Sequence, residues 1–269
     1  MTTQTPAVRR MLNKVPEVTV WFWIIKILCT TVGESFADYV NETLGFGLTN
    51  TTLAFSAALV VVLAIQLRAV RYVPWVYWLS VVLISVVGTL LTDNLTDARG
   101  VPLWISSTVF AVLLAAVFAA WYARERTLSI HSINTRQREG WYWLVVLVTF
   151  ALGTALGDWT LDLTGWSPGT SVLLPAGLIL AVFVAWRAGA GSVLSFWLGY
   201  ILTRPLGANI GDYLASGRHD GGLGLGTGWT SLVFLVTILA VVTYLSITRV
   251  DVTDETLHEV EAGRSTSHA

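Results

Sequence analysis

Four aspartates occupy the same place in a pattern that recurs along an otherwise apolar chain. In each set a tryptophan is followed ten positions later by a glycine and fifteen positions later by an aspartate. The sets are Trp23, Gly33 and Asp38; Trp78, Gly88 and Asp93; Trp143, Gly153 and Asp158; and Trp197, Gly207 and Asp212. The composition predicts only about 0.04 chance matches to this pattern, so the four sets indicate an internal repeat.

Other oxygen-bearing side chains share a helical face with these aspartates. Residues four apart lie on one face of a helix, and acids or hydroxyls stand four positions before or after several of the aspartates. The candidate cation or proton site is Glu34, Asp38, Asp93, Asp158 and Asp212, with a second layer of Glu42, Asp97, Asp162, Thr89, Thr154 and Asn209. No histidine or cysteine joins this set, so it suits a hard ion such as manganese, magnesium or calcium, or a proton.

Two basic residues, Lys26 and Arg204, lie eight positions before Glu34 and Asp212 respectively. One interpretation makes them internal counter-ions that an arriving cation or proton displaces. The other makes them members of fixed ion pairs, or side chains that reach out to the membrane interface. Pro205, directly after Arg204, permits a kink in its helix. Glu34 is expected to be the deepest acid, and it is our candidate for proton exchange.

The elements that carry these residues are predicted to be membrane-spanning helices. Of the 269 residues, 54% are hydrophobic and only 12% are charged, which is too little charge for the surface of a soluble domain. Crossing a bilayer takes about 20 apolar residues. Such runs lie at 17–38, 51–70, 74–95, 102–122, 140–160, 170–187, 191–213 and 228–248. No cleavage site follows the first run, so it is expected to remain as the first helix.

Basic residues in the connections predict the orientation. Twelve lie in the two tails and in the connections after the second, fourth and sixth runs, whereas only Arg99 and Arg218 lie in the other connections. Positive residues stay on the cytoplasmic side, so both termini are predicted to be cytoplasmic. The predicted segments are a cytoplasmic tail at 1–14, a first half at 15–130, a second half at 131–248 and a second cytoplasmic tail at 249–269.

The predicted fold is an all-α integral membrane protein of eight transmembrane helices. They form four parallel two-helix repeats that are pseudo-symmetric about the membrane normal. The odd-numbered helices should surround a common axis, and the even-numbered helices should face lipid. Each repeated aspartate lies about 30 Å along its helix, so the acids should gather near the outer boundary of the membrane. The repeated glycines should allow close helix packing, and the tryptophans should pack between helices or anchor at the interface.

The four Trp-Gly-Asp sets resemble those of a family of bacterial membrane-anchored proteins made of four tandem two-helix repeats of unknown function. The resemblance covers residues 15–248. It implies a multi-pass protein of the bacterial cytoplasmic membrane, and it implies no chemistry for any residue.

The residues favour a transporter of a hard cation, such as a manganese-like divalent metal, with proton coupling through the acidic cluster. A passive cation channel and a membrane assembly protein without transport stay open as alternatives. No enzymatic activity, no resident cofactor and no nucleic-acid partner are expected. The expected partners are the lipid bilayer and an inorganic cation or proton, and the oligomeric state stays open. The single cysteine, Cys29, excludes an internal disulfide.

Overall fold

The computed structural model describes residues 13–252, and this part of the chain is helical with no strand. The elements are α1 (Val20–Asp38), η1 (Tyr39–Thr43), α2 (Leu48–Arg68), α3 (Pro74–Thr96), α4 (Leu103–Glu125), η2 (Ile130–Ser132), α5 (Arg136–Thr164), α6 (Pro168–Ser171), α7 (Leu173–Arg187), α8 (Ser192–Ala215), η3 (Arg218–Asp220) and α9 (Gly226–Thr248). The predictions that fall on residues 1–12 and 253–269 lie outside the described residues.

Seven helical segments in the described part of the chain are long and apolar enough to cross a membrane. They correspond to α1 with η1, α2, α3, α4, α5, α6 with α7, and α9. The remaining long helix, α8, has 24 residues and occupies the predicted seventh run, but it is not among the seven. It is less apolar because it contains Arg204, Asn209 and Asp212. The prediction of a multi-pass, all-α membrane protein is therefore confirmed.

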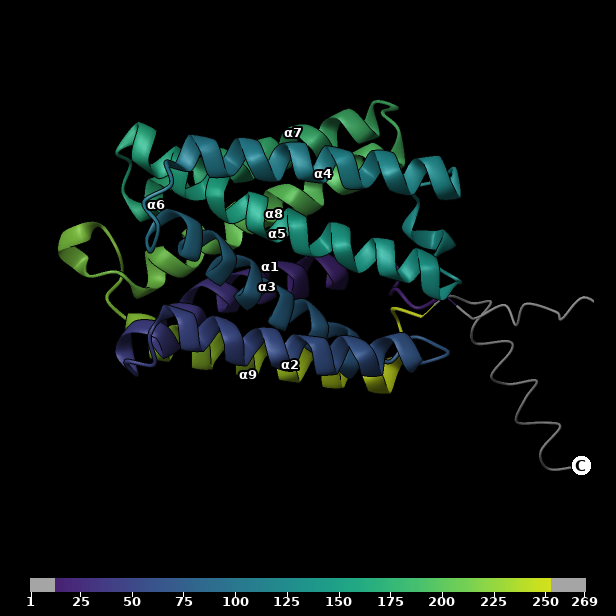
Figure 1. Ribbon diagram of the computed structural model, residues 1–269, viewed down its shortest axis with the longest axis horizontal. Coiled ribbons are helices and arrows are strands. Elements are labelled where there is room, and N and C mark those ends of the chain that lie inside the picture. The colour runs from purple at the N-terminus through teal and green to yellow at the C-terminus, as the bar shows by residue number, and fades with distance from the viewer. Residues whose placement is uncertain (1–12, 253–269) are drawn as a thin grey trace, which may run out of the picture.

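The first helices of the four repeats contact one another in a closed cycle, which we call the inner ring. In this ring α1 packs on α3, α3 on α5, α5 on α8, and α8 on α1. The long helices run side by side along the long axis of the molecule (Figure 1). Each remaining long helix packs on the inner helix of the following repeat, since α2 packs on α3, α4 on α5 and α7 on α8. The last one, α9, packs on α1 and so completes the cycle.

Burial separates the inner ring from the outer helices. Within α3, for example, the stretch from Ser80 to Leu90 is buried without interruption. The outer helices instead expose large apolar side chains along their length: Val60 and Val61 of α2, Val109 and Val112 of α4, Leu180 and Phe183 of α7, and Val233 and Val236 of α9. A helix that is apolar on its exposed face is suited to hydrocarbon rather than to water.

The repeated glycines lie where neighbouring inner helices touch. A Cβ atom on Gly33 would overlap Ser85, one on Gly88 would overlap Phe150, one on Gly153 would overlap Arg204, and one on Gly207 would overlap Thr30. In every case the partner stands three positions before the repeated glycine of the next inner helix. The same close contact is therefore made four times around the ring.

Replacing Gly88 by alanine should destabilise the protein strongly. The new Cβ would lie 2.7 Å from the Cβ of Phe150 and 3.3 Å from the backbone of Ala151, so α3 and α5 would have to separate. Overpacking of this kind costs about 1–3 kcal/mol. Thermal unfolding of the purified protein in detergent measures the loss. The control is Gly177→Ala in α7, where no atom lies within 4 Å of the new Cβ; an equal loss in both variants would contradict the packing role.

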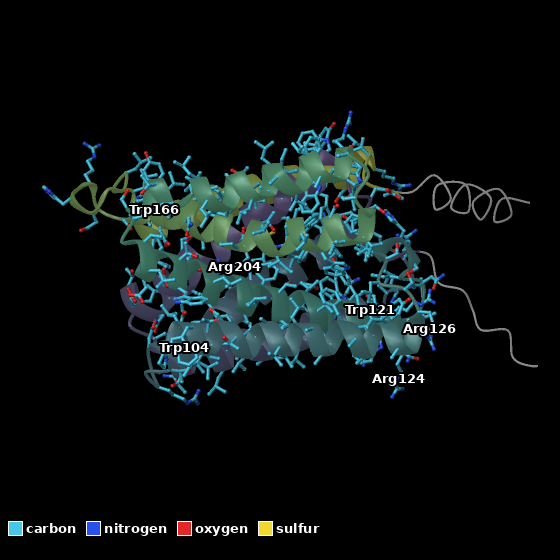
Figure 2. The ribbon with its side chains drawn as sticks, turned by 90° about the horizontal axis from the view of Figure 1, so that it is seen from above. Trp104, Trp121, Arg124, Arg126, Trp166 and Arg204 are labelled. Atoms are coloured by element: carbon cyan, nitrogen blue, oxygen red, sulfur yellow. The ribbon has the colours of Figure 1, made fainter. Side chains whose placement is uncertain are left out.

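Three of the repeated tryptophans, Trp78, Trp143 and Trp197, are buried in the bundle, and Trp23 is partly buried. Each one packs on the aromatic residue that precedes the tryptophan of the previous repeat. The four contacts, with their ring-centroid distances, are Phe22 with Trp78 (5.7 Å), Tyr77 with Trp143 (5.3 Å), Tyr142 with Trp197 (6.2 Å) and Phe196 with Trp23 (5.7 Å). These eight residues, which we call the aromatic layer, link all four inner helices. Other tryptophans lie at an end of the bundle, including Trp104 and Trp166 (Figure 2).

Candidate cation-binding site

A cavity of about 490 Å³ opens at the end of the bundle where α1, α3 and α5 finish, and we call this end the acidic end. The residues that line the cavity are Glu34, Asp38, Asn41, Glu42, Asp93, Thr96, Asp97, Gly100, Val101, Pro102, Leu103, Asp158 and Asp162. Seven of them are carboxylates, and none is a lysine or an arginine. An excess of acidic side chains in one cavity favours a positively charged guest.

The predicted acids form three layers in this cavity. Glu42, Asp97 and Asp162 are exposed at its mouth, and Asp38, Asp93, Asp158 and Asp212 below them are partly buried. Glu34 lies deepest, with 12% of its side chain exposed. Asp212 does not line the cavity, but its carboxylate lies within 4.8 Å of carboxylate oxygens of Glu34 and Asp38. The structure therefore brings all five predicted site acids to one end of the inner ring.

Local structure explains how α1 supplies acids from two layers. The helix ends at Asp38 and continues into the π-helical turn η1, which adds Asn41 and Glu42 to the cavity wall. Such π-helical turns are frequent at functional sites. The inner helices also direct their C-terminal carbonyl groups toward this end, and their partial negative charge adds to that of the acids.

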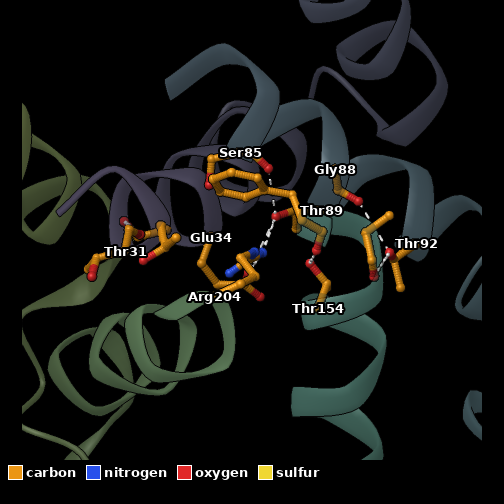
Figure 3. A network of polar contacts seen from close by, with 12 residues as sticks. Thr31, Glu34, Ser85, Gly88, Thr89, Thr92, Thr154 and Arg204 are labelled. Atoms are coloured by element: carbon orange, nitrogen blue, oxygen red, sulfur yellow. Dashed lines mark hydrogen bonds and ion pairs between the residues drawn. The ribbon is translucent and has the colours of Figure 1, made fainter. Parts of the chain in front are cut away.

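Arg204 closes the floor of the cavity. Its guanidinium donates hydrogen bonds to the carboxylate of Glu34 and to the hydroxyl of Thr89 (Figure 3). The Thr89 hydroxyl also lies 3.4 Å from the same oxygen of Glu34. The Arg204 side chain is only 1% exposed, and its Nε and Nη1 atoms have no hydrogen-bond partner among residues 13–252. Glu34 is the charged partner that the described residues give this buried guanidinium, so Arg204 depends on Glu34 for charge compensation.

Lys26 is not a counter-ion of the acids, which corrects the sequence interpretation. Its ammonium group has no hydrogen-bond partner in the described part of the chain, and it lies 3.8 Å from the ring centroid of Phe150 and 4.2 Å from that of Tyr200. The physical reason is distance, because eight residues of helix place Lys26 about 12 Å below Glu34. The aromatic faces stabilise the ammonium by a cation–π interaction instead.

Two members of the predicted second layer also lie away from the cavity. The Thr154 hydroxyl is buried and donates to the Phe150 carbonyl at 3.1 Å. Asn209 is buried and donates to the Ser171 carbonyl at 2.9 Å, which joins α8 to α6. Asn209 stands three positions before Asp212, on the flank of α8 that faces α6 rather than the cavity.

Two lining residues with polar side chains were not predicted from the sequence, although their spacing indicates them. Asn41 and Thr96 line the cavity, and each follows a repeated aspartate by three positions. Residues three apart share a helical face as residues four apart do, so a search at both spacings would have included them.

A second buried polar cluster lies at the opposite end of the bundle, which we call the closed end. The Lys14 ammonium is paired with the Glu139 carboxylate at 2.6 Å, and neither side chain is more than 1% exposed. Asp251 is buried as well, and its carboxylate accepts a hydrogen bond from the Tyr72 hydroxyl at 2.6 Å. Burial raises the pKa of the Asp251 carboxyl and that of the Tyr72 hydroxyl. Both residues fall within the predicted cytoplasmic tails, 1–14 and 249–269, and the structure shows that Lys14 and Asp251 pack against the end of the bundle.

Comparison with known proteins gives one result. The model of a family described as a repeat of unknown function matches the chain four times, at residues 21–72, 76–127, 141–190 and 195–251. Each match begins close to a repeated tryptophan and covers one inner helix with the outer helix that follows it. The chain matches no curated protein and no solved structure.

Proposed function

Because the chain belongs to the repeat family DUF347, whose description states no activity, we propose a function from its own residues. We propose that the protein transports a hard cation, such as a manganese-like divalent metal, in exchange with protons. The observation that carries this proposal is the acidic cavity, which is open at one end and closed at its floor by the ion pair of Arg204 with Glu34. Oxygen ligands without nitrogen or sulfur are those that hard cations prefer.

The floor of the cavity favours a transporter over a passive channel. Below Glu34 the inner ring holds the guanidinium of Arg204 and the ammonium of Lys26, and both side chains are 1% exposed. The aromatic layer lies further toward the closed end. An open cation pore needs a continuous polar path, whereas the buried guanidinium of Arg204 and a layer of rings oppose a cation. A cation can compete with Arg204 for Glu34, and that exchange would couple binding to a change of conformation.

The topology that goes with this function has eight membrane spans, including α8. This helix is long enough at 24 residues, and its neighbours α1, α5 and α7 belong to candidate spans. Its charged residues Arg204 and Asp212 face the inner ring, where both lie beside Glu34. The four equivalent glycine contacts and the aromatic layer support an arrangement of the repeats about an axis along the membrane normal.

The orientation places the acidic end outside and the closed end in the cytoplasm. The backbone N–H of Glu17 donates to the carbonyl of Asp251 at 3.0 Å, so the first and last described segments meet at the closed end. Arg124 and Arg126 also lie at the end opposite Trp104 and Trp166 (Figure 2). Positive residues favour the cytoplasmic side. In a bacterium, this is the arrangement of a multi-pass protein of the cytoplasmic membrane.

Asp38→Asn and Asp212→Asn should weaken cation uptake into vesicles that contain the purified protein. Each substitution removes one of the three carboxylates that lie within 4.8 Å of one another, and the half-saturating Mn²⁺ concentration should rise about tenfold. The measurement is Mn²⁺ uptake against concentration, repeated with Mg²⁺ and Ca²⁺. Asp220→Asn is the control, because Asp220 is exposed in η3 and does not line the cavity. If the unmodified protein moves none of these ions, or both variants match it, the proposal is wrong.

A further inference from the structure

The Lys14–Glu139 pair at the closed end is held by contacts from three parts of the chain. The Lys14 ammonium also donates to the carbonyl of Leu67, at the end of α2, at 3.2 Å. The second oxygen of Glu139 accepts hydrogen bonds from the side-chain amide of Gln66 at 3.0 Å and from the indole of Trp143 at 3.4 Å. The carboxylate is thus surrounded by donors in a buried site.

Residues 13–19 lie across this end of the bundle and connect its separate elements. The backbone N–H of Lys14 donates to the carbonyl of Ile133 at 3.4 Å, and that of Glu17 donates to Asp251. Val15 is buried in the same core cluster as Ile130 and Ile133. The segment before α1 therefore joins the start of α5, the end of α2 and the residues after α9.

Glu139 connects this end to the aromatic layer. Its partner Trp143 is the repeated tryptophan of the third repeat, and it packs on Tyr77 within that layer. Glu139 and Asp158 are nineteen positions apart on α5, which corresponds to about 28 Å of helix. The start of α5 thus lies at the closed end, where Lys14 pairs with Glu139. Its last turns lie at the acidic end, where Asp158 lines the open cavity.

We propose that the Lys14–Glu139 pair is an inner gate that keeps the closed end shut while the acidic cavity is open. This inference rests on the proposed transport function, because a transporter must open its two ends alternately. The release of a cation at the closed end requires residues 13–19 to leave Glu139. The other partners of the pair within residues 13–252 are uncharged, so its rupture leaves two buried charges uncompensated and makes opening at this end costly.

The test measures how accessible the acidic cavity is from its own side of the membrane. A cysteine introduced by Thr96→Cys on the cavity wall is labelled by a membrane-impermeant maleimide added at the acidic end. Cys29 is buried, so the chain without Thr96→Cys gives the background. Lys14→Gln and Glu139→Gln should each shift molecules toward the state open at the closed end. The labelling rate should fall about threefold if the state open at the acidic end drops to a third of the molecules.

Three further variants make the result specific. Lys14→Arg keeps a positive charge and N–H donors opposite Glu139 and should leave the labelling rate unchanged. Gln66→Leu removes one hydrogen bond to Glu139 without stranding a charge, so it tests the gate even where a single charge variant fails to fold. Arg138→Gln breaks a neighbouring, partly exposed ion pair with Glu125 and should leave labelling unchanged.

The outcomes separate the gate from the transport function. Unchanged labelling in Gln66→Leu and in the folded charge variants would overturn the gate, as would an equal fall in Arg138→Gln. A fall in labelling in the charge variants that Lys14→Arg does not share supports the gate. If that fall occurs in a protein whose vesicles take up no cation, the gate stands as a conformational device and the transport function fails.

Discussion

Replacing Glu34 by glutamine should abolish pH-dependent cation flux. Glu34 is the deepest acid of the cavity and the carboxylate that accepts a hydrogen bond from Arg204 at the floor. Glutamine keeps the shape of the side chain but can neither bind a proton nor carry the charge for which a cation and Arg204 compete. Uptake of Mn²⁺ into vesicles, measured with and without a pH gradient, should lose its dependence on the gradient and fall at least about tenfold.

The same substitution should also destabilise the fold, and a double variant separates the two effects. Arg204 is 1% exposed, so the loss of Glu34 leaves a buried guanidinium without its counter-charge, at a cost of about 3–5 kcal/mol. In the double variant Glu34→Gln with Arg204→Gln, no charge is stranded, and the unfolding temperature should recover in part. Flux should still be absent. Normal pH-dependent uptake by the folded double variant would show that the pair is structural.

Replacing Trp78 by alanine should cost about 3–5 kcal/mol of folding free energy. The side chain is 1% exposed, and its ring centroid lies 5.7 Å from that of Phe22 and 5.1 Å from that of Tyr77. Its indole N–H donates to the Tyr72 hydroxyl at 3.1 Å, so truncation also leaves a buried hydroxyl with one partner fewer. Thermal or denaturant unfolding in detergent measures the loss.

The matched control for this prediction is Trp104→Ala at the start of α4. Trp104 is 55% exposed and lies at an end of the bundle (Figure 2), where a tryptophan suits the membrane interface. Its loss should change the folding free energy by no more than about 0.5 kcal/mol. Similar losses in both variants would mean that the repeated tryptophan contributes only as a general apolar side chain, without a special role in the aromatic layer.

Local pattern accounts for what could be predicted from the amino-acid sequence. Hydrophobic runs locate the helices because a bilayer demands about 20 apolar residues in succession. Identical spacing reveals the repeat, and the separation of Glu34, Asp38 and Glu42 by four positions places them on one helical face. These properties belong to a single helix, so they need no knowledge of its neighbours. The acidic end of the bundle was predictable for this reason.

Only the tertiary structure decides which residues that lie far apart in the chain contact one another. Helical spacing says which face Arg204 occupies, but not that Glu34, 170 positions away, lies opposite it. For the same reason the sequence suggested Lys26 as a counter-ion of the acids. In the structure its side chain lies deeper in the bundle and contacts the rings of Phe150 and Tyr200.

The closed end illustrates the same limit most clearly. Lys14 stands just before the first span and Glu139 at the start of the fifth, so each has the appearance of a solvated charge in the sequence. They are buried together because α9 packs on α1 and residues 13–19 lie across this end of the bundle. Burial of a charge depends on every element that packs around it, and no local pattern records that.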